Sequence, residues 1–570
     1  MFRMLLLLPG LLISLISSAQ QDRKIIREYR SLNIQIQYGT GVFSLKKEKG
    51  VSGRQEEVGT YSCAELPFIR VDVRSVLHNG ADHYTVVHDV NLTSDKRLDK
   101  DLTIFFPVNA IQHSSELWYP LKNGIGKTIN SPTEKNTAMF RCAGRWQKME
   151  SDLALPLAVY TGRNGKYAVM TDPFFSSMFG QDRVYWTYPK EVGLEDKVEK
   201  RTIAETVGVK DPDDAISRYY QTILKDIPPG PAWIKDIAMV TYDYMSDGGA
   251  GWFRDIDSMA KAFPAADRKK MLLTLHGWYD FVGRYCFNTA TGKLDEAWHN
   301  RLMNDRLTLA DLHTRIRYAK DRGFKVALYF ADGIISGDKL EDYDPEKTIP
   351  GSGWNGPDVL GNTYRRNISC KEYYDFYINY ARALFKEFAS EVDMFVWDET
   401  FYISAGHLGT EKHRSYLDRT FMRLVKEITG MLHQLNPEVA FVTSDLIGPQ
   451  NTFAALADVP PYSLVADGTY QDSGCHPDYW SYGIFPNYRN VLWSCNWWAA
   501  SMFKFTVFGV MEYQAPVALS NGWEDNKGFS EMTPAEKNNC IRLFNYRKSF
   551  STQLKWLQAI PPFIDNCISR

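Results

Sequence analysis

Acidic residues end a series of apolar runs in the C-terminal part of the chain, and this placement is the first sign of chemistry in the sequence. Seven runs end in a carboxylate; the residues are Asp243, Asp280, Asp332, Asp398 with Glu399, Asp445, Asp467 and Glu512. Crowding ionised carboxylates is costly unless function requires it. One such residue could simply cap a helix, but seven in corresponding positions predict a shared site.

Cleavage of a glycosidic bond needs two carboxylates, one to protonate the leaving oxygen and one to attack or stabilise the anomeric carbon. Tryptophans in or beside the same segments could offer flat apolar faces to a pyranose ring. They are Trp278, Trp354, Trp397, Trp493, Trp497, Trp498 and Trp523. The alternative for each ring is a place in the core. The residue types therefore predict a carbohydrate site.

The sequence gives no reason to expect a metal or an organic cofactor at this site. None of the eight cysteines forms a C-x-x-C pair, and no H-E-x-x-H motif occurs. The acidic segment 338–344 lacks the spacing of an EF-hand loop, so a solvated loop is favoured over a Ca²⁺ site. The formal net charge of -2 does not point to nucleic acid.

The elements that must position the carboxylates alternate between apolar runs and helical stretches. The eight runs are Ala238–Asp243, Leu272–Asp280, Lys325–Asp332, Met394–Glu399, Val439–Asp445, Ser463–Asp467, Val491–Trp493 and Thr506–Glu512. Such alternation predicts a (β/α)₈ barrel, whose site lies at the carboxyl ends of the strands. An open doubly wound sheet is the alternative, disfavoured because no glycine-rich phosphate loop follows the first run.

The N-terminal part has a different pattern, with short strand-like runs separated by turn signals such as Asn79-Gly80 and Asn164-Gly165. We expect a β-sandwich over residues 20–228 and the barrel over residues 229–570. The boundary lies in Lys225–Trp233, which contains three prolines and a glycine.

The first nineteen residues read as a secretory signal peptide. Arg3 precedes the apolar run Met4–Ile16, which is too short to span a bilayer, and Ser17-Ser18-Ala19 is a small-residue cleavage signature. We expect cleavage after Ala19, no membrane insertion, and a periplasmic or secreted protein. In such a compartment two disulfides, Cys286 with Cys370 and Cys475 with Cys495, are conceivable, with free thiols as the alternative.

Four segments carry a resemblance to a known group of enzymes. Val392–Phe401 resembles strand 4 of the α-galactosidase-like retaining glycosidases, a group that includes families 27, 31 and 36 and the endo-α-N-acetylgalactosaminidases. Gly323–Phe330 is similar to the third strand of that group, and Leu273–Tyr279 to the second strand of its endo-acting members. Leu464–Asp472 falls where the group carries its acid/base.

This resemblance implies roles for individual residues. Asp398 would be the nucleophile, and the acid/base would be Asp467 or Asp472, with Asp467 favoured because it ends the expected strand. The substrate-binding residues would be Asp243, Trp278, Asp332, Trp397, Glu399, Asp445, Trp493, Glu512 and Trp523.

The expected protein is an exported, retaining glycoside hydrolase that acts on an α-linked oligosaccharide, polysaccharide or glycoconjugate. Two alternatives stay open. One is an α-amylase-like barrel in which the acid is Asp445 on strand 5. The other is a barrel that binds sugar without catalysis, since fold does not fix function.

Overall fold

A computed structural model gives the fold. It describes residues 21–22, 24–108, 114–120, 126–130, 138–140, 153, 155–163, 165–180, 183–188, 199–227, 230–243, 245, 249–281, 283–331, 335–336, 343–350, 359–368, 370–397, 417–445, 468–471, 517–521 and 528–549. The chain divides into two compact units, and the main division falls between Asp226 and Ile227. None of the helices in the described ranges is long and apolar enough to cross a membrane.

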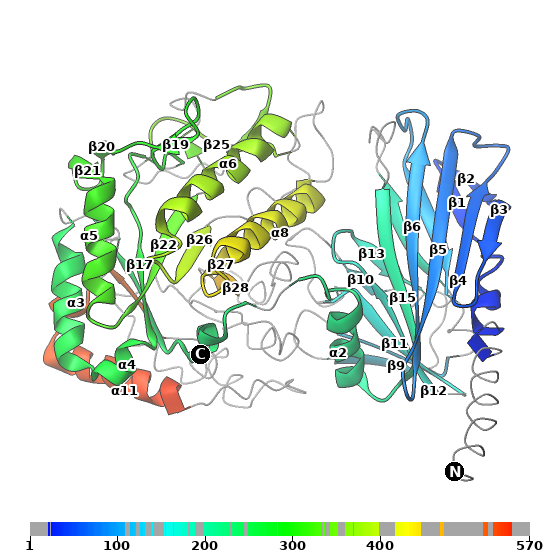
Figure 1. Ribbon diagram of the computed structural model, residues 1–570, viewed down its shortest axis with the longest axis horizontal. Helices are drawn as coiled ribbons and strands as arrows, with labels where there is room; N and C mark the ends of the chain where they lie inside the picture. Colours follow the sequence, from blue (N-terminus) through cyan, green and yellow to red (C-terminus); the bar gives the residue numbers. More distant parts are fainter. Residues whose placement is uncertain are drawn as a thin grey trace, which may run out of the picture. The chain divides into compact units, whose positions relative to one another are not determined.

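Two antiparallel sheets make up the first unit (Figure 1). The smaller sheet has six strands in the order β10 (Ala138–Phe140), β13 (Ser177–Phe179), β14 (Arg183–Tyr188), β7 (Leu102–Pro107), β1 (Gln35–Tyr38), β2 (Gly41–Ser44). The larger has nine in the order β3 (Lys46–Ser52), β4 (Glu56–Ser62), β5 (Ile69–Asn79), β6 (Tyr84–Ser94), β15 (Glu199–Val209), β12 (Gly165–Thr171), β11 (Leu157–Gly162), β8 (Glu116–Pro120), β9 (Gly126–Asn130). The unit is sheet-rich, as the turn signals predicted.

Alternation of side chains explains why these runs form strands. Along β7 every second residue is buried, and β6 shows nearly the same period, so each strand turns one face to a core. His88 of β6 contacts Phe106 of β7 with ring centroids 5.1 Å apart, which joins the two sheets. The helix α2 (Pro212–Thr222) follows; it is capped by the Asp211 side chain and packs on β11 and β15.

The second unit contains a sheet of seven parallel strands. Their order is β28 (Gly468–Gln471), β27 (Ala440–Asp445), β26 (Met394–Trp397), β22 (Lys325–Ala331), β17 (Met271–Leu275), β16 (Met239–Asp243), β29 (Val517–Asn521). The first six along the chain are neighbours in sequence order, and β29 pairs with the free edge of β16. Short antiparallel pieces follow β17 and β22: β18 (Phe287–Asn288), β19 (Lys293–Leu294), β20 (Ala297–Asn300), β21 (Asp305–Thr308), β23 (Ile335–Ser336), β24 (Thr348–Pro350), β25 (Thr363–Arg366).

The first five strands of this sheet lie where apolar runs predicted them. The expected strands Ser463–Asp467 and Thr506–Glu512 lie outside the described residues. The two further strands that join the sheet are β28 and β29, which begin later in the chain than those runs. Hydrogen bonding to β27 and β16 sets these positions, and it does not follow from hydrophobicity alone. The expected strand Val491–Trp493 lies outside the described residues.

Helices cover one face of the parallel sheet. The helices of this unit are η3 (Ala232–Asp236), α3 (Ala250–Ala262), α4 (Ala265–Arg268), α5 (Leu309–Lys320), α6 (Lys371–Phe388), α8 (Leu417–Leu435), η10 (Phe529–Glu531) and α11 (Pro534–Ser549). Figure 1 shows α6 and α8 running along β22, β26 and β27. Phe385 of α6 packs on Phe395 of β26 with ring centroids 4.6 Å apart, and Phe421 of α8 packs on Trp397 at 5.6 Å. Phe395 and Trp397 therefore point toward the helices.

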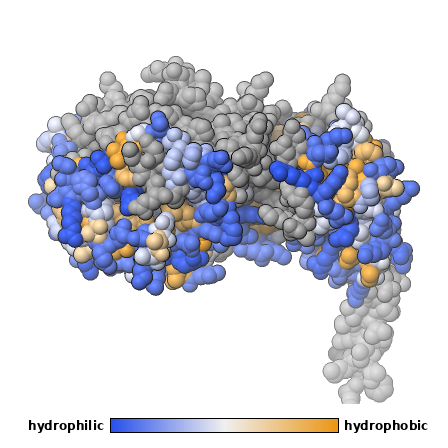
Figure 2. Space-filling view, turned by 90° about the horizontal axis from the view of Figure 1, so that it is seen from above, coloured by the Kyte–Doolittle hydropathy of each residue, from blue (hydrophilic) through white to orange (hydrophobic). Residues whose placement is uncertain are grey.

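Hydrophilic residues cover most of the coloured surface in Figure 2, and apolar residues form only small groups there. Large exposed apolar side chains in the described residues are limited to Val42, Val51, Val58 and Leu435. Val51 and Val58 are cross-strand partners in β3 and β4. Scattered residues of this kind need no partner to explain them.

Two charged groups fix α5 and α6 around the amino end of β26. His313 of α5 lies between Glu391 Oε2, 2.8 Å from Nδ1, and Glu387 Oε1, 2.9 Å from Nε2. Asp393 accepts hydrogen bonds from the Nζ of Lys320 at 2.6 Å and of Lys325 at 3.0 Å. These contacts connect α5, β22, α6 and β26.

The His313 contacts predict a pH-dependent stability. Partial burial lowers the pKa of His313, but hydrogen bonds and charge from Glu391 and Glu387 outweigh it and raise the pKa above its usual value. The stabilisation is therefore complete below about pH 6.5 and is lost as the pH rises through the raised pKa. At pH 6 we expect His313→Gln to lower the free energy of unfolding by on the order of 1 kcal/mol, a value kept small because the ring is partly solvated.

Urea unfolding at pH 6 and pH 8.5 measures this difference. The difference in the free energy of unfolding between wild type and His313→Gln should become smaller at the higher pH. His299→Gln, at an exposed position, should have the same free energy of unfolding as wild type at both pH values. A gap that stays constant between the two pH values would show that protonated His313 does not stabilise the fold.

Candidate active site at the carboxyl ends of the parallel strands

The carboxyl ends of the parallel strands share one edge of the sheet, where the candidate carboxylates were expected. Asp243 ends β16 and is paired in register with Leu275 of β17 and Asn521 of β29. Asp445 ends β27 in the same way and is paired with Gln471 of β28. The backbone of both aspartates thus lies at the expected edge. Eight candidates lie outside the described residues: Asp332, Asp398, Glu399, Asp467, Asp472, Trp493, Glu512 and Trp523.

The observed strands change which of these candidates stands at a carboxyl end. Asp467 directly precedes β28 in the chain, and Asp472 directly follows it, so Asp467 does not end this strand as we expected. Glu512 likewise precedes β29 and does not end it. Asp467 was favoured because it was expected to end the strand, and the same argument now favours Asp472.

Two tryptophans expected to face a sugar are core residues. Trp278 has no exposed surface; its indole N–H donates to the carbonyl oxygen of Tyr329 at 2.5 Å. Trp397 is equally buried and packs against Tyr377 of α6, with ring centroids 4.7 Å apart. The expectation that these two rings bind substrate was wrong, because both rings are fully buried in contacts with neighbouring residues. The sequence left two alternatives for each ring, a sugar-binding surface or a place in the core, and both rings lie in the core.

The segment after β17 is held rigidly at the carboxyl edge. The Asn300 amide donates to the carbonyl oxygens of Gly277 at 2.6 Å and Tyr279 at 2.9 Å. The Trp298 indole N–H donates to the carbonyl oxygen of Trp278 at 2.7 Å. Gly277 has a φ of 73°, in the left-handed region that glycine tolerates best. The two hairpins that follow β17 therefore fix the path of its continuation.

His276 is the first side chain of this held segment. It is 4% exposed, and its ring packs edge-on against Tyr329 of β22, with centroids 3.7 Å apart, and against Tyr279 at 5.5 Å. Burial lowers the pKa of His276 well below its usual value, so the imidazole is neutral at neutral pH. A neutral ring can donate and accept a hydrogen bond, and it does not act as a cation.

Neither His276 nor Tyr329 was given a role in the sequence analysis. The signal was present in the run Leu273–Tyr279, which places a histidine just beyond an apolar strand. The cross-strand register, with Thr274 of β17 opposite Ala327 of β22, brings His276 and Tyr329 onto the same side. That register is not readable from one segment alone.

The described residues show neither a metal cluster nor the expected disulfide. They contain no group of three or more His, Cys, Asp or Glu side chains that could hold a metal ion. Asp344, the last residue of the acidic segment, lies 3.4 Å from the Nζ of Lys347, which opposes a cation there. Cys286 and Cys370 are both free, so their proposed bond is wrong. Cys475 and Cys495 lie outside the described residues.

Comparison with known proteins shows the fold. No protein-family model matches the chain, and no curated protein matches it in sequence. Solved structures do match, among them the GH36 α-galactosidases AgaA and AgaB from Geobacillus stearothermophilus. AgaA is 11% identical with a TM-score of 0.53, covering 93% of this chain and 78% of its own. AgaB is 10% identical with a TM-score of 0.51, covering 93% and 77%. The chain has an α-galactosidase-like glycoside hydrolase fold, which confirms the resemblance at that level.

Asn300 provides a test of how the edge is held. Asn300→Asp keeps the shape and the acceptor that receives the Met303 N–H, but it removes both donors to the segment after β17. Because two buried carbonyl groups lose their partner and a carboxylate is buried, we expect a loss of about 2–5 kcal/mol in the free energy of unfolding. Denaturant unfolding measures it. The neighbouring variant His299→Ala should change the value by less than about 0.5 kcal/mol; equal effects of the two would refute the role of Asn300.

Proposed function

We propose that this protein is an exported retaining glycoside hydrolase that cleaves an α-linked galactoside or a closely related α-glycoside. The observation that supports this most is the combination of an α-galactosidase-like fold with a strand, β26, that leads directly into Asp398. AgaA and AgaB, which share the fold, are α-galactosidases, and an AgaA variant was solved with raffinose.

The proposed barrel rests on strand order. Six parallel strands follow one another in sequence, and β29 pairs with β16, the first of them. One further strand between β28 and β29 would close an eight-stranded barrel. Val491–Trp493 is our candidate for it, and the first unit would be the β-sandwich that precedes the barrel.

The proposed role of Asp398 rests on side-chain alternation. Trp397 packs on α6 and α8, and successive side chains of a strand point to opposite faces. Continued alternation would place Asp398 on the face away from the helices, which is the inside of a closed barrel. A carboxylate there would face substrate at the carboxyl ends of the strands.

The proposed mechanism has two steps. The Asp398 carboxylate attacks the anomeric carbon while an acid protonates the departing oxygen, which gives a covalent glycosyl-enzyme. The same acid, now a base, then takes a proton from the water that releases the sugar. We assign this role to Asp472, because it follows β28 directly. A retaining enzyme holds the two carboxyl groups about 5–5.5 Å apart.

The remaining candidates would hold the sugar. Asp243 and Asp445 stand at the carboxyl edge, where their carboxylates would accept hydrogen bonds from hydroxyl groups. Asp332, Glu399, Glu512, Trp493 and Trp523 stay candidates for the same shell. The proposed chemistry needs only these side chains and water.

Substitution of Asp398 tests the nucleophile. Asp398→Asn is nearly isosteric but cannot attack, so turnover of p-nitrophenyl α-galactoside should fall on the order of 10⁴-fold or more with an unchanged far-UV circular dichroism spectrum. NMR of the first product formed by wild type should show the α-anomer, as retention requires. Activity that persists in Asp398→Asn, or a β-anomer as the first product, would contradict the mechanism.

Leaving-group dependence tests the acid/base. Asp472→Ala should be mild for p-nitrophenyl α-galactoside, whose leaving group needs little protonation, and severe for raffinose. Asp467→Ala, in the same stretch of chain, is the matched control and should affect both substrates alike. If Asp467→Ala is mild for p-nitrophenyl α-galactoside and severe for raffinose, the acid/base is Asp467. If Asp445→Ala shows this difference between the substrates, the enzyme works as an α-amylase-like barrel.

Export is a separate proposal that the N-terminal sequence motivates. The mature protein should begin at Gln20 and reside in a periplasm or outside the cell. N-terminal sequencing of protein purified from the natural source checks this. An intact Met1 would contradict export.

A further inference from the structure

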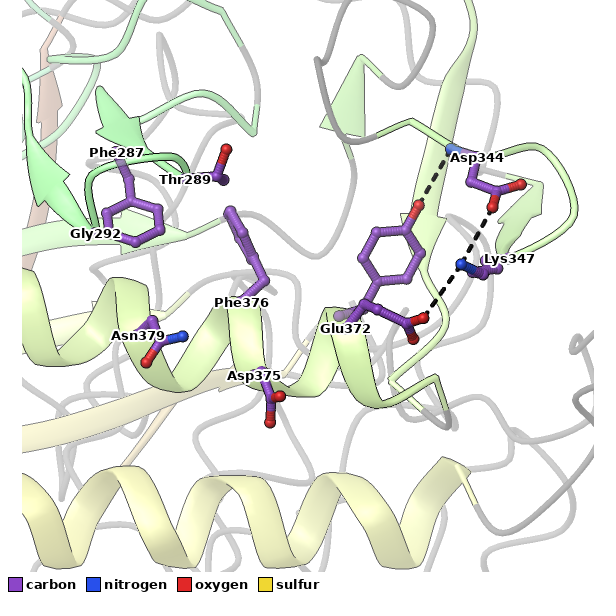
Figure 3. Close-up of a pocket in the computed structure, with 10 residues that line it drawn as sticks. Phe287, Thr289, Gly292, Asp344, Lys347, Glu372, Asp375, Phe376 and Asn379 are labelled. Atoms are coloured by element: carbon purple, nitrogen blue, oxygen red, sulfur yellow. Dashed lines mark hydrogen bonds and ion pairs between the residues drawn. The ribbon is translucent and has the colours of Figure 1, made fainter.

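A pocket of about 280 Å³ opens where the first turns of α6 meet the β18–β19 hairpin (Figure 3). Its lining residues are Phe287, Thr289, Gly292, Asp344, Lys347, Glu372, Tyr373, Asp375, Phe376 and Asn379. They come from segments that follow the carboxyl ends of β17 and β22, so the pocket belongs to the same side of the sheet as the proposed active site. None of these residues is a candidate for the catalytic chemistry above.

Two aromatic rings form the apolar part of the pocket. Phe287 of β18 and Phe376 of α6 lie edge to face, with centroids 5.7 Å apart, and both are half-buried. The Arg366 guanidinium lies 3.9 Å from the Phe376 ring centroid and supports that ring. Partly exposed rings in a concave site offer apolar surface to the C–H faces of a ligand.

Paired charges form the polar rim. Lys347 Nζ lies 3.4 Å from Asp344 Oδ2 and 3.3 Å from Glu372 Oε1, as Figure 3 shows. Asp375 is hydrogen-bonded to Lys371, one turn before it. Each carboxylate of the lining therefore has a lysine within ion-pair distance, and Lys347 is shared by Asp344 and Glu372. The carboxylate oxygens keep capacity to accept hydrogen bonds from hydroxyl groups.

Aromatic contacts connect this pocket to the held segment after β17. Phe287 contacts Tyr380 at 5.4 Å between centroids, Tyr380 contacts Tyr285 at 6.2 Å, and Tyr285 contacts Tyr329 at 6.3 Å. Tyr329 in turn packs on His276. The pocket is thus built on the same packed layer as the carboxyl edge, which fixes its position relative to that edge.

We propose that this pocket is a second sugar subsite, which binds one neutral hexose of an oligosaccharide and takes no part in bond cleavage. Apolar rings beside carboxylates that are paired with lysines suit a neutral polyhydroxylated ring, which needs both apolar contact and hydrogen-bond acceptors. The proposal rests on the proposed function only for the identity of the oligosaccharide. The subsite would raise affinity for substrates longer than one sugar.

A bulky residue at the mouth of the pocket tests this. Thr289 lines the pocket, whereas Thr291 lies on the same hairpin, is exposed and does not line it. Thr289→Trp should therefore block the pocket, and Thr291→Trp is the matched control. With raffinose, Thr289→Trp should raise KM about tenfold, equivalent to about 1.4 kcal/mol, with kcat unchanged. With p-nitrophenyl α-galactoside both variants should match wild type.

Direct binding separates failure of this proposal from failure of the proposed function. Saturation-transfer NMR with raffinose needs no turnover. If wild type hydrolyses neither substrate but Thr289→Trp loses raffinose signals that Thr291→Trp retains, the pocket is a sugar subsite on a protein of another function. The proposal is overturned if the two variants behave alike, if raffinose gives no signal with wild type, or if Thr289→Trp impairs both substrates equally.

Discussion

Parallel pairing of the strands in the second unit is the constraint from which the candidate site follows. Because β16, β17, β22, β26, β27, β28 and β29 all run in one direction, segments separated by hundreds of residues arrive at one edge of one sheet. Helices cover one face of this sheet, and the carboxyl edge is where a sheet of parallel strands usually carries its functional side chains. The hairpins after β17 and the insertion after β22 then build on it.

Charge and packing fix this sheet at different points. Asp393 accepts from two lysines and from the backbone N–H of Val326, which ties the amino ends of β22 and β26 together. Near the other end, the rings of Phe395 and Trp397 lie against α6 and α8. With one end held by ionic hydrogen bonds and one face by aromatic contacts, β26 has little freedom to slip by a residue, and a slip would exchange its two faces.

Much of the architecture could be predicted from the sequence, and the misses have physical causes. Hydrophobic runs located β16, β17, β22, β26 and β27, because a buried parallel strand must be apolar. They did not include β28 and β29, whose positions depend on hydrogen-bond register with a neighbouring strand. Composition could not tell that Trp278 and Trp397 are core residues, since a tryptophan suits a core and a sugar platform equally. His276 and Tyr329 come together because of the register between two strands, and this register cannot be inferred from the sequence of either segment alone.

Pairing of β29 with β16 also has a consequence for biosynthesis. Met239 and Val517, register partners in this pair, are about 280 residues apart in the chain. At ribosomal speeds of about 5–20 residues per second, β16 would wait roughly 15–55 s for its partner to be made. During that interval its edge has unpaired N–H and C=O groups that can associate with other chains. The order of synthesis therefore makes the first strand of the sheet its most exposed edge, and a nascent chain of this protein has reason to depend on chaperones at that stage.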